Sequence, residues 1–188
     1  MRKKVMNKTD KIHKEIAEEE YAYYGVGEEV TTKNNYLVGN TLDFNDNRSG
    51  NGEQIYAIAS DGSNVLPNAP LSERAKVKEI TLLYRGSTNP LGLFTGKAGE
   101  VGRDWGSNNT VLGLKIGTGQ RGVTGQLEAS AAYLKEIMEK YPNAKINIYG
   151  HSLGSMDAQY ALACITDYSR INEAYIYNGP NIYSLLSY

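Results

Sequence analysis

The sequence predicts an α/β fold in which a mostly parallel sheet is flanked by helices, and three observations support this prediction. Short apolar runs rich in aliphatic and aromatic residues begin near residues 80, 145 and 174, as expected of buried strands. An amphipathic helix precedes the second run, and an Ala-rich helix follows it. Strands and helices that alternate in this way form βαβ units, which implies parallel strands joined by right-handed crossovers.

The length and composition are those of one globular domain. A chain of 188 residues can enclose a sizeable core, so residues 1–188 are expected to form a single domain. Within it, residues 1–52 are expected to form an N-terminal helix and a polar loop region. The net charge of -1 gives no reason to expect nucleic acid as a partner. The lone cysteine, Cys164, is interpreted as a small core residue.

The sequence shows no recognisable targeting segment. The N-terminus is basic, but no apolar stretch of the kind found in signal peptides follows it. No apolar run is long enough to span a bilayer. A cytoplasmic location is therefore the default expectation, and export by a route that uses no cleaved signal stays open.

The first third of the chain is expected to hold one helix and a long loop. The helix is predicted over residues 7–24, with Thr9 or Asp10 as its cap. His13 lies among Lys and Glu side chains, so we expect it to be exposed. Residues 25–52 are rich in turn-forming residues and are interpreted as a loop with a short strand near its middle.

Two strands are predicted next, and the second runs into a candidate functional turn. Residues 55–59 and 80–84 have the composition of strands. The second strand ends in the sequence Tyr-Arg-Gly-Ser at residues 84–87. An acyl hydrolase needs an oxyanion donor on a loop after a neighbouring strand, and Ser87 is suited to this role. Taken alone, these residues are better explained as an ordinary turn at the end of a strand.

A literal G-x-G-x-x-G occurs at residues 117–122 and raises the alternative of a dinucleotide site. Such a site needs an acidic residue at the end of the following strand, to bind the ribose. Here the following strand ends at Tyr149 and Gly150 instead. A loop near a pocket is therefore the preferred interpretation, and no cofactor is expected.

The clearest helix is predicted over residues 124–141. Thr124 can cap it, and Pro142 ends it. Its apolar residues recur at helical spacing and form one stripe, which is interpreted as core: Leu127, Ala131, Leu134, Met138 and Tyr141.

The strongest functional signal is Gly-His-Ser-Leu-Gly at residues 150–154, which matches G-x-S-x-G. A strand-like run precedes it and a helical run follows, which is the context of a nucleophile elbow. The sharp turn would place Ser152 in a strained conformation, while Gly150 and Gly154 let strand and helix approach closely. The Leu153 amide, at the start of the helix, can point at a developing oxyanion.

Together these motifs resemble the class 3 (fungal-type) lipases of the α/β-hydrolase fold. The resemblance rests on Tyr-Arg-Gly-Ser at residues 84–87, Asp104-Trp105, a long helix and the Gly-His-Ser-Leu-Gly elbow, and it covers residues 80–180. It implies an α/β-hydrolase-type fold, present here as its N-terminal portion through the elbow. It also implies that Ser152 is the nucleophile, with Leu153 N–H and Ser87 in the oxyanion hole.

The sequence departs from the family pattern in the catalytic triad. The hydrolase order is Ser, then Asp or Glu, then His, but no histidine follows Ser152. His151 adjoins the nucleophile and its side chain should diverge from it, while Asp157 lies in the elbow helix. We therefore expect the fold to be truncated after the strand that follows this helix, with the triad Asp and His beyond Tyr188. A split protein and a non-catalytic relative are the alternatives.

Two smaller departures concern spacing and packing. The interval from Ser87 to Asp104 is longer than usual in the family, so the lid is expected to differ. Ser155 stands where a small residue such as Gly is common, which is a mild change.

The predicted function is that of a serine carboxylic ester hydrolase of lipase type, which forms an acyl-enzyme on Ser152. The expected partners are a lipid or small ester substrate, a transient membrane or lipid interface, and a missing C-terminal half or complementing chain. No metal or cofactor is expected. The isolated 188 residues should hydrolyse esters poorly. The alternative is a non-catalytic or half-domain interaction module of the same fold.

Overall fold

The structure is a computed structural model, and it describes residues 8–47, 49–85 and 124–186. Its centre is a six-stranded sheet in the order β1-β2-β3-β4-β5-β6. The strands are β1 (Glu29–Thr31), β2 (Leu37–Asp46), β3 (Gln54–Ala59), β4 (Glu79–Tyr84), β5 (Lys145–His151) and β6 (Ile171–Tyr177). The helices are α1 (Asp10–Glu18), α2 (Leu71–Arg74), α5 (Gly125–Lys140) and α6 (Gly154–Ala163), with short 3-10 turns at Glu19–Tyr21, Tyr168–Arg170 and Tyr183–Leu185.

The sheet is mixed, so the prediction of a mostly parallel sheet is wrong for its N-terminal half. Strands β4, β5 and β6 are parallel, as predicted. Strands β1 to β4 pair antiparallel. The structure therefore belongs to the α/β class in the broad sense, with a parallel half that carries the elbow.

The antiparallel half contains the largest error of the sequence interpretation. Strands β1 and β2 lie within residues 25–52, which were interpreted as a loop with one short strand at residues 36–38. That strand coincides with the start of β2, whereas β1 and the rest of β2 were not predicted. An antiparallel strand with one covered face needs an apolar side chain only at some positions, so β2 is stable with polar Asn40, Asp43 and Asn45 among its residues. Only Val38 and Leu42 are its buried large apolar side chains.

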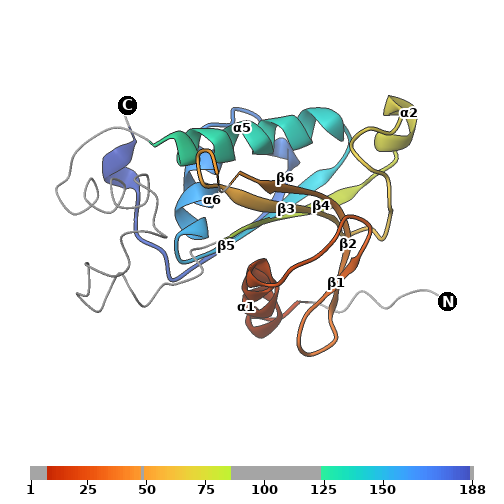
Figure 1. Cartoon of the computed structure of the whole chain (residues 1–188), viewed down its shortest axis with the longest axis horizontal. Coiled ribbons are helices and arrows are strands. Elements are labelled where there is room, and N and C mark those ends of the chain that lie inside the picture. The colour runs from red at the N-terminus through yellow and green to blue at the C-terminus, as the bar shows by residue number, and fades with distance from the viewer. Residues whose placement is uncertain (1–7, 48, 86–123, 187–188) are drawn as a thin grey trace.

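Helices cover both faces of the sheet. Figure 1 shows α5 and α6 along one face, with α1 on the other. The α5–α6 side holds the larger apolar core, which includes Ile80, Leu82, Leu134 and Ile148. The α1 side holds a smaller core rich in aromatic rings, among them Tyr56 and Tyr149.

Helix α5 confirms its predicted boundaries to within a residue. The Thr124 hydroxyl caps it by accepting from the Leu127 N–H at 3.5 Å. The predicted stripe faces the core, with Met138 half-buried and the other four members buried. Helix α6 ends at Ala163, and Cys164 packs half-buried against the core.

Helix α1 begins after Thr9, whose hydroxyl accepts from Ile12 N–H, so the predicted cap is confirmed. The expectation that His13 is exposed is wrong, because only 4% of its surface is accessible. Its Nδ1 lies 2.8 Å from the Tyr149 hydroxyl, and its ring stacks on Tyr175 with 3.6 Å between centroids. Lys11 and Lys14, beside His13 in the sequence, are exposed on other faces of the helix. Their charge therefore gave no indication that His13 is buried.

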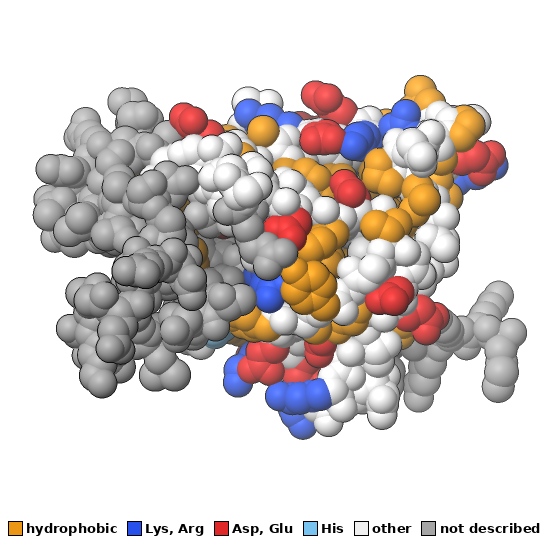
Figure 2. Space-filling view, viewed as in Figure 1, with side chains coloured by type: hydrophobic (Ala, Val, Ile, Leu, Met, Phe, Trp, Pro, Cys, Tyr) orange, Lys and Arg blue, Asp and Glu red, His pale blue; other side chains and the backbone are white. Residues whose placement is uncertain are grey.

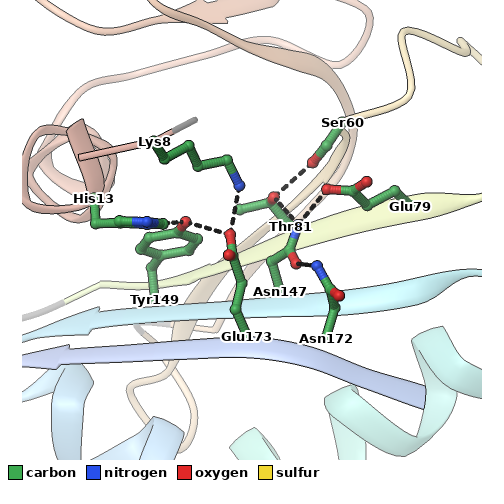
Figure 3. Close-up of polar contacts among 9 residues, drawn as sticks. All are labelled: Lys8, His13, Ser60, Glu79, Thr81, Asn147, Tyr149, Asn172 and Glu173. Carbon is green, nitrogen blue, oxygen red and sulfur yellow. Dashed lines mark hydrogen bonds and ion pairs between the residues drawn. The ribbon is translucent and has the colours of Figure 1, made fainter. Parts of the chain in front are cut away.

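A polar network links α1 to the sheet at this point, as Figure 3 shows. The Tyr149 hydroxyl donates to Glu173 Oε1 at 2.9 Å, so it accepts a hydrogen bond from the His13 Nδ1–H. The Lys8 ammonium pairs with the same Glu173 carboxylate. Because each group has a partner, the network holds α1 in one position on the sheet.

His13→Ala is expected to lower the free energy of unfolding by about 2 kcal/mol, because it removes a buried hydrogen bond and a stacked ring. Burial lowers the pKa of His13, although Glu173 opposes this. Below a pH of about 6.5, His13 is therefore protonated in the unfolded chain but less so in the folded chain. The free energy of unfolding consequently falls as the pH falls. Urea unfolding at pH 7.5 and 5.5 measures both effects. Lys14→Ala, at an exposed position of the same helix, should change neither by as much.

Figure 2 shows the surface of the face that is drawn in Figure 1. Acidic and basic side chains are interspersed there, and no extended patch of one sign is visible. In the described residues, no helix is both long enough and apolar enough to cross a membrane.

Candidate functional site

The turn between β5 and α6 has the backbone that a nucleophile elbow requires. Ser152 lies in this turn with a φ of +54°, in the left-handed region that a side chain disfavours. Strand β5 ends one residue before it, and α6 begins two residues after it. The predicted strained conformation of Ser152 is thus confirmed. A strained residue of this kind persists only where its surroundings hold it, and such residues cluster at functional sites.

Two glycines allow the strand and the helix to meet around Ser152, as predicted. A Cβ on Gly150 would lie 2.6 Å from the carbonyl oxygen of Gly154. A Cβ on Gly154 would lie only 1.9 Å from the carbonyl oxygen of Tyr84, on the neighbouring strand. Both distances are far below contact, so any larger residue would push α6 off the sheet.

The elbow is also fixed to β6, which the sequence did not reveal. The Ser152 N–H donates to the Tyr177 carbonyl at 2.9 Å, and the Ser155 hydroxyl donates to the Ser152 carbonyl at 2.6 Å. A Cβ on Gly179 would lie 1.3 Å from Ser155 Oγ. Gly179 therefore provides the space for Ser155, which explains how this chain accommodates Ser where a smaller residue was expected.

The ends of three parallel strands meet at this edge of the sheet. Tyr84 of β4 pairs with Gly150 of β5, and His151 pairs with Tyr177 of β6. Ser152 consequently lies beside the chain that leaves β4 through Arg85. In open α/β sheets, ligands bind at the carboxyl ends of the parallel strands. Ser87, two residues beyond Arg85, lies outside the described residues, as do Asp104-Trp105 and the glycine-rich stretch at residues 117–122.

Leu153, the predicted oxyanion donor, lies at the start of α6. It is the N-cap of α6 with a helical backbone, and within the described residues its N–H donates no hydrogen bond. Amides at a helix N-terminus lack partners within the helix and carry its positive end. The Leu153 side chain belongs to a separate apolar cluster, which contains Leu127, Leu153, Met156, Ile182 and Leu185.

Both ring nitrogens of His151 have hydrogen-bond partners other than Ser152, which agrees with the expectation that its side chain diverges from the nucleophile. Its Nε2 lies 3.2 Å from the Asn178 amide nitrogen, a donor, so this ring nitrogen accepts. Its Nδ1 then carries the proton and donates to the Tyr21 hydroxyl at 2.9 Å. Burial lowers the pKa of His151 and keeps the ring neutral. The other histidine, His13, is bonded to Tyr149.

Asp157 is the carboxylate closest to Ser152 along the chain, and it is buried rather than presented to the site. Only 1% of its surface is accessible, and its Oδ2 accepts from Gln126 Nε2 at 2.9 Å. Burial raises the pKa of Asp157 to about 8, and the nearby charge of Glu53 contributes to the rise. The carboxyl is therefore protonated at neutral pH and does not provide the charge that a triad acid supplies.

Arg85 directly follows the end of β4. Its side chain is buried and lies over the Tyr23 ring, 5.3 Å from the centroid, while its N–H donates to the Gln54 carbonyl. Among the described residues, no group of three or more His, Cys, Asp or Glu side chains could hold a metal ion.

The described residues thus define an α/β sheet with a Ser-containing elbow at the carboxyl edge of its parallel strands. Comparison with known families adds one likeness: the family model described as Mbeg1-like matches residues 115–186. This match spans α5, β5, the elbow, α6 and β6, which is less than half of the chain. Neither the curated proteins nor the solved structures contain a match.

Proposed function

We propose that this chain carries the nucleophile of a serine carboxylic ester hydrolase of lipase type, and that the nucleophile is Ser152. The observation that carries the proposal is the conformation of Ser152, with a φ of +54° between two glycines that permit backbone contact. A turn of ordinary structural use would place Gly or Asn at such a position, since both tolerate the left-handed region better than Ser.

In the proposed reaction, Ser152 Oγ attacks the ester carbonyl carbon and its proton passes to a base. The tetrahedral oxyanion is stabilised by the Leu153 N–H and by Ser87, and the alcohol leaves with the proton. Water then hydrolyses the acyl-enzyme. Both histidines of the sequence are bonded elsewhere. The proposal therefore requires a His and an Asp from another source, either beyond Tyr188 or on a complementing chain.

The proposed substrates are acyl esters of lipids. The apolar cluster that contains Leu153 and Met156 lies directly beside the elbow, together with Leu185 and the partly buried Leu186. These side chains are buried against one another, so the choice of lipid esters rests chiefly on the resemblance of the elbow and its flanks to the class 3 lipases.

The first test is covalent labelling with a fluorophosphonate probe, which reacts with activated serines, followed by peptide mapping. The 188-residue chain and the protein purified from its native source are treated in parallel. Labelling at Ser152 is expected in the native protein, and Ser152→Ala should abolish both labelling and hydrolysis of p-nitrophenyl butyrate. Ser169→Ala, at an exposed position, serves as the control.

The outcomes separate the alternatives. If the native protein is labelled and the 188-residue chain reacts only slowly, the base comes from elsewhere, as proposed. If the native protein hydrolyses esters equally well with Ser152→Ala, the proposal fails.

The second candidate is a non-catalytic or half-domain interaction module, and the position of β6 favours it. Among the described strands, β6 pairs with β5 alone and forms an edge of the sheet, with Ile176 exposed on it. Exposed strand edges can pair with another chain. Concentration-dependent self-association of the fragment in sedimentation velocity, without any labelling at Ser152 in the native protein, would favour this function over the first.

A further inference from the structure

A groove lies on the α1 face of the sheet. It is near the amino ends of the parallel strands, whereas Ser152 lies at their carboxyl ends. It is bounded by α1, by the turn between β1 and β2, and by the start of β4, and its volume is about 770 Å³. Ser152 follows the end of β5, whereas Glu79 of the groove begins β4, which is parallel to β5. A ligand in this groove would therefore not contact the elbow. Volumes of this size are typical of small-molecule sites.

The floor of the groove is polar although it lies on a buried sheet face. The Ser60 and Thr81 hydroxyls are 2.6 Å apart, and Asn147 Nδ2 donates to Glu79 Oε1 at 2.6 Å (Figure 3). Asn147 does not line the groove itself but supports Glu79, and it accepts in turn from Asn172 Nδ2 at 2.9 Å. Hydrogen bonds between neighbours satisfy these groups, so the floor is a fixed surface rather than one that must rearrange.

The wall formed by α1 contains a buried carboxylate that lacks a donor. Glu15 is only 2% exposed and lines the groove. Its Oε1 accepts from Asn34 Nδ2, whereas Oε2 has no hydrogen-bond partner in the described part of the chain. A buried acceptor without a donor is unfavourable, and more so when it is charged. The neighbouring Lys8 ammonium does not serve it, because it pairs with Glu173.

The remaining lining indicates what would complement Glu15. Apolar side chains of Ile12, Ile16 and Val38 line the groove together with the aromatic Tyr36. The charged residues of the lining besides Glu15 are Lys8, Lys11, Asp61 and Glu79. An apolar wall accommodates a hydrocarbon stem, and an aromatic face attracts a cation. A buried carboxylate between them favours a charged nitrogen with N–H donors.

We propose that this groove binds a small organic cation, a primary ammonium on an apolar stem, with its ammonium donating to Glu15 Oε2. The stem lies along Ile12, Ile16 and Val38, and the Tyr36 ring flanks the charge. This site is independent of the proposed hydrolase function, because the groove and the elbow lie at opposite ends of the parallel strands.

The test is a titration of the ¹⁵N-labelled chain with n-pentylamine, followed by ¹H–¹⁵N correlation spectra at constant pH and ionic strength. Pentan-1-ol, which has the same stem and no charge, is the matched neutral probe. Pentylamine should shift the amides of residues 34–39 and 60–62 with a dissociation constant on the order of 1 mM. Pentanol should bind at least about tenfold more weakly, since it lacks the charge-assisted hydrogen bond.

Glu15→Gln retains the acceptor for Asn34 but removes the charge, so it should weaken pentylamine binding about tenfold or more and leave pentanol unaffected. Glu139→Gln, on the exposed surface of α5, should change nothing. Equal affinity for the two probes in the unmodified chain, or shifts confined to residues outside the groove, would overturn the proposal without reference to any variant. Retained affinity in a folded Glu15→Gln protein would overturn it as well.

Discussion

Gly154→Ala is expected to destabilise the protein by about 3 kcal/mol or more, although alanine is the better helix former. Gly154 is the first residue of α6 and its φ is not positive, so its conformation suits alanine. The expected loss is entirely steric, because the added Cβ would lie 1.9 Å from the Tyr84 carbonyl oxygen. The atoms that this Cβ would meet belong to the backbone, so no side-chain rotation can relieve the clash. Helix α6 would have to move away from β4.

Equilibrium urea unfolding monitored by circular dichroism measures this effect. Gly62→Ala is the matched control, because Gly62 has a φ of +80° and open space around the position of its Cβ. That variant carries only the backbone strain of a left-handed alanine, on the order of 1 kcal/mol. A Gly154→Ala protein as stable as the Gly62→Ala protein would show that the elbow is not packed against β4 as described.

The sequence predicted the structure correctly where the pattern involves residues that are close together in the chain. The helix at α5 was predicted from its cap and its stripe, because both depend on neighbours along the chain. The elbow was predicted for the same reason, since strand, glycines and helix follow one another within a few residues. The strained Ser152 follows from that spacing, whatever the rest of the fold does.

The N-terminal half was misread because its structure depends on partners distant in the sequence. Strand β2 exists because it pairs with β3 and, through its other edge, with β1. Its own residues alternate too weakly to signal a strand. His13 was misread for a related reason: the rings that bury it, Tyr149 and Tyr175, are more than 130 residues away.

The candidate site shows the same division. Ser152 and Leu153 could be placed from the motif alone, whereas the contacts that fix them could not. The Tyr177 carbonyl and Gly179 reach the elbow only through the pairing of β5 with β6. Asn178, which holds His151, has a φ of +52° at the end of β6. The sequence Asn-Gly-Pro at residues 178–180 signalled a turn but not its contact with the elbow.

A group of buried polar side chains lies behind the elbow and contains two carboxyl groups. Asp157 and Glu53 are 1% and 3% exposed, and Gln126, at 2%, donates to Asp157. Within the described residues, Asp157 Oδ1, Glu53 Oε2 and Gln126 Oε1 have no hydrogen-bond partner. All three atoms are acceptors, whereas the donors beside Asp157 are Gln126 Nε2 and the Ser130 hydroxyl, so acceptors outnumber donors here. A proton on Asp157 removes one charge and supplies one donor, which agrees with the rise of its pKa to about 8.

Asp157→Asn is therefore expected to stabilise the protein, and by more at pH 8 than at pH 5. The folded chain holds the Asp157 proton up to a pH of about 8, whereas the unfolded chain loses it near pH 4. Between these values the folded state binds more protons, so stability falls as the pH rises. Asparagine has no proton to lose, and its amide supplies a donor. The expected gain at pH 8 is about 3 kcal/mol. This is below the limit of about 5.5 kcal/mol that follows from roughly 1.4 kcal/mol per unit over a rise of about four pKa units.

Thermal unfolding of both proteins between pH 5 and 8.5 checks this expectation. The difference in melting temperature should widen steadily with pH, because only the original chain carries the buried carboxyl. Asp167→Asn is the control at an exposed position, where hydrogen bonds from Ser169 lower the pKa of the carboxyl, so no gain should follow from removing its charge. A difference that is independent of pH would mean that Asp157 is charged in the folded protein and that an unseen donor supports it.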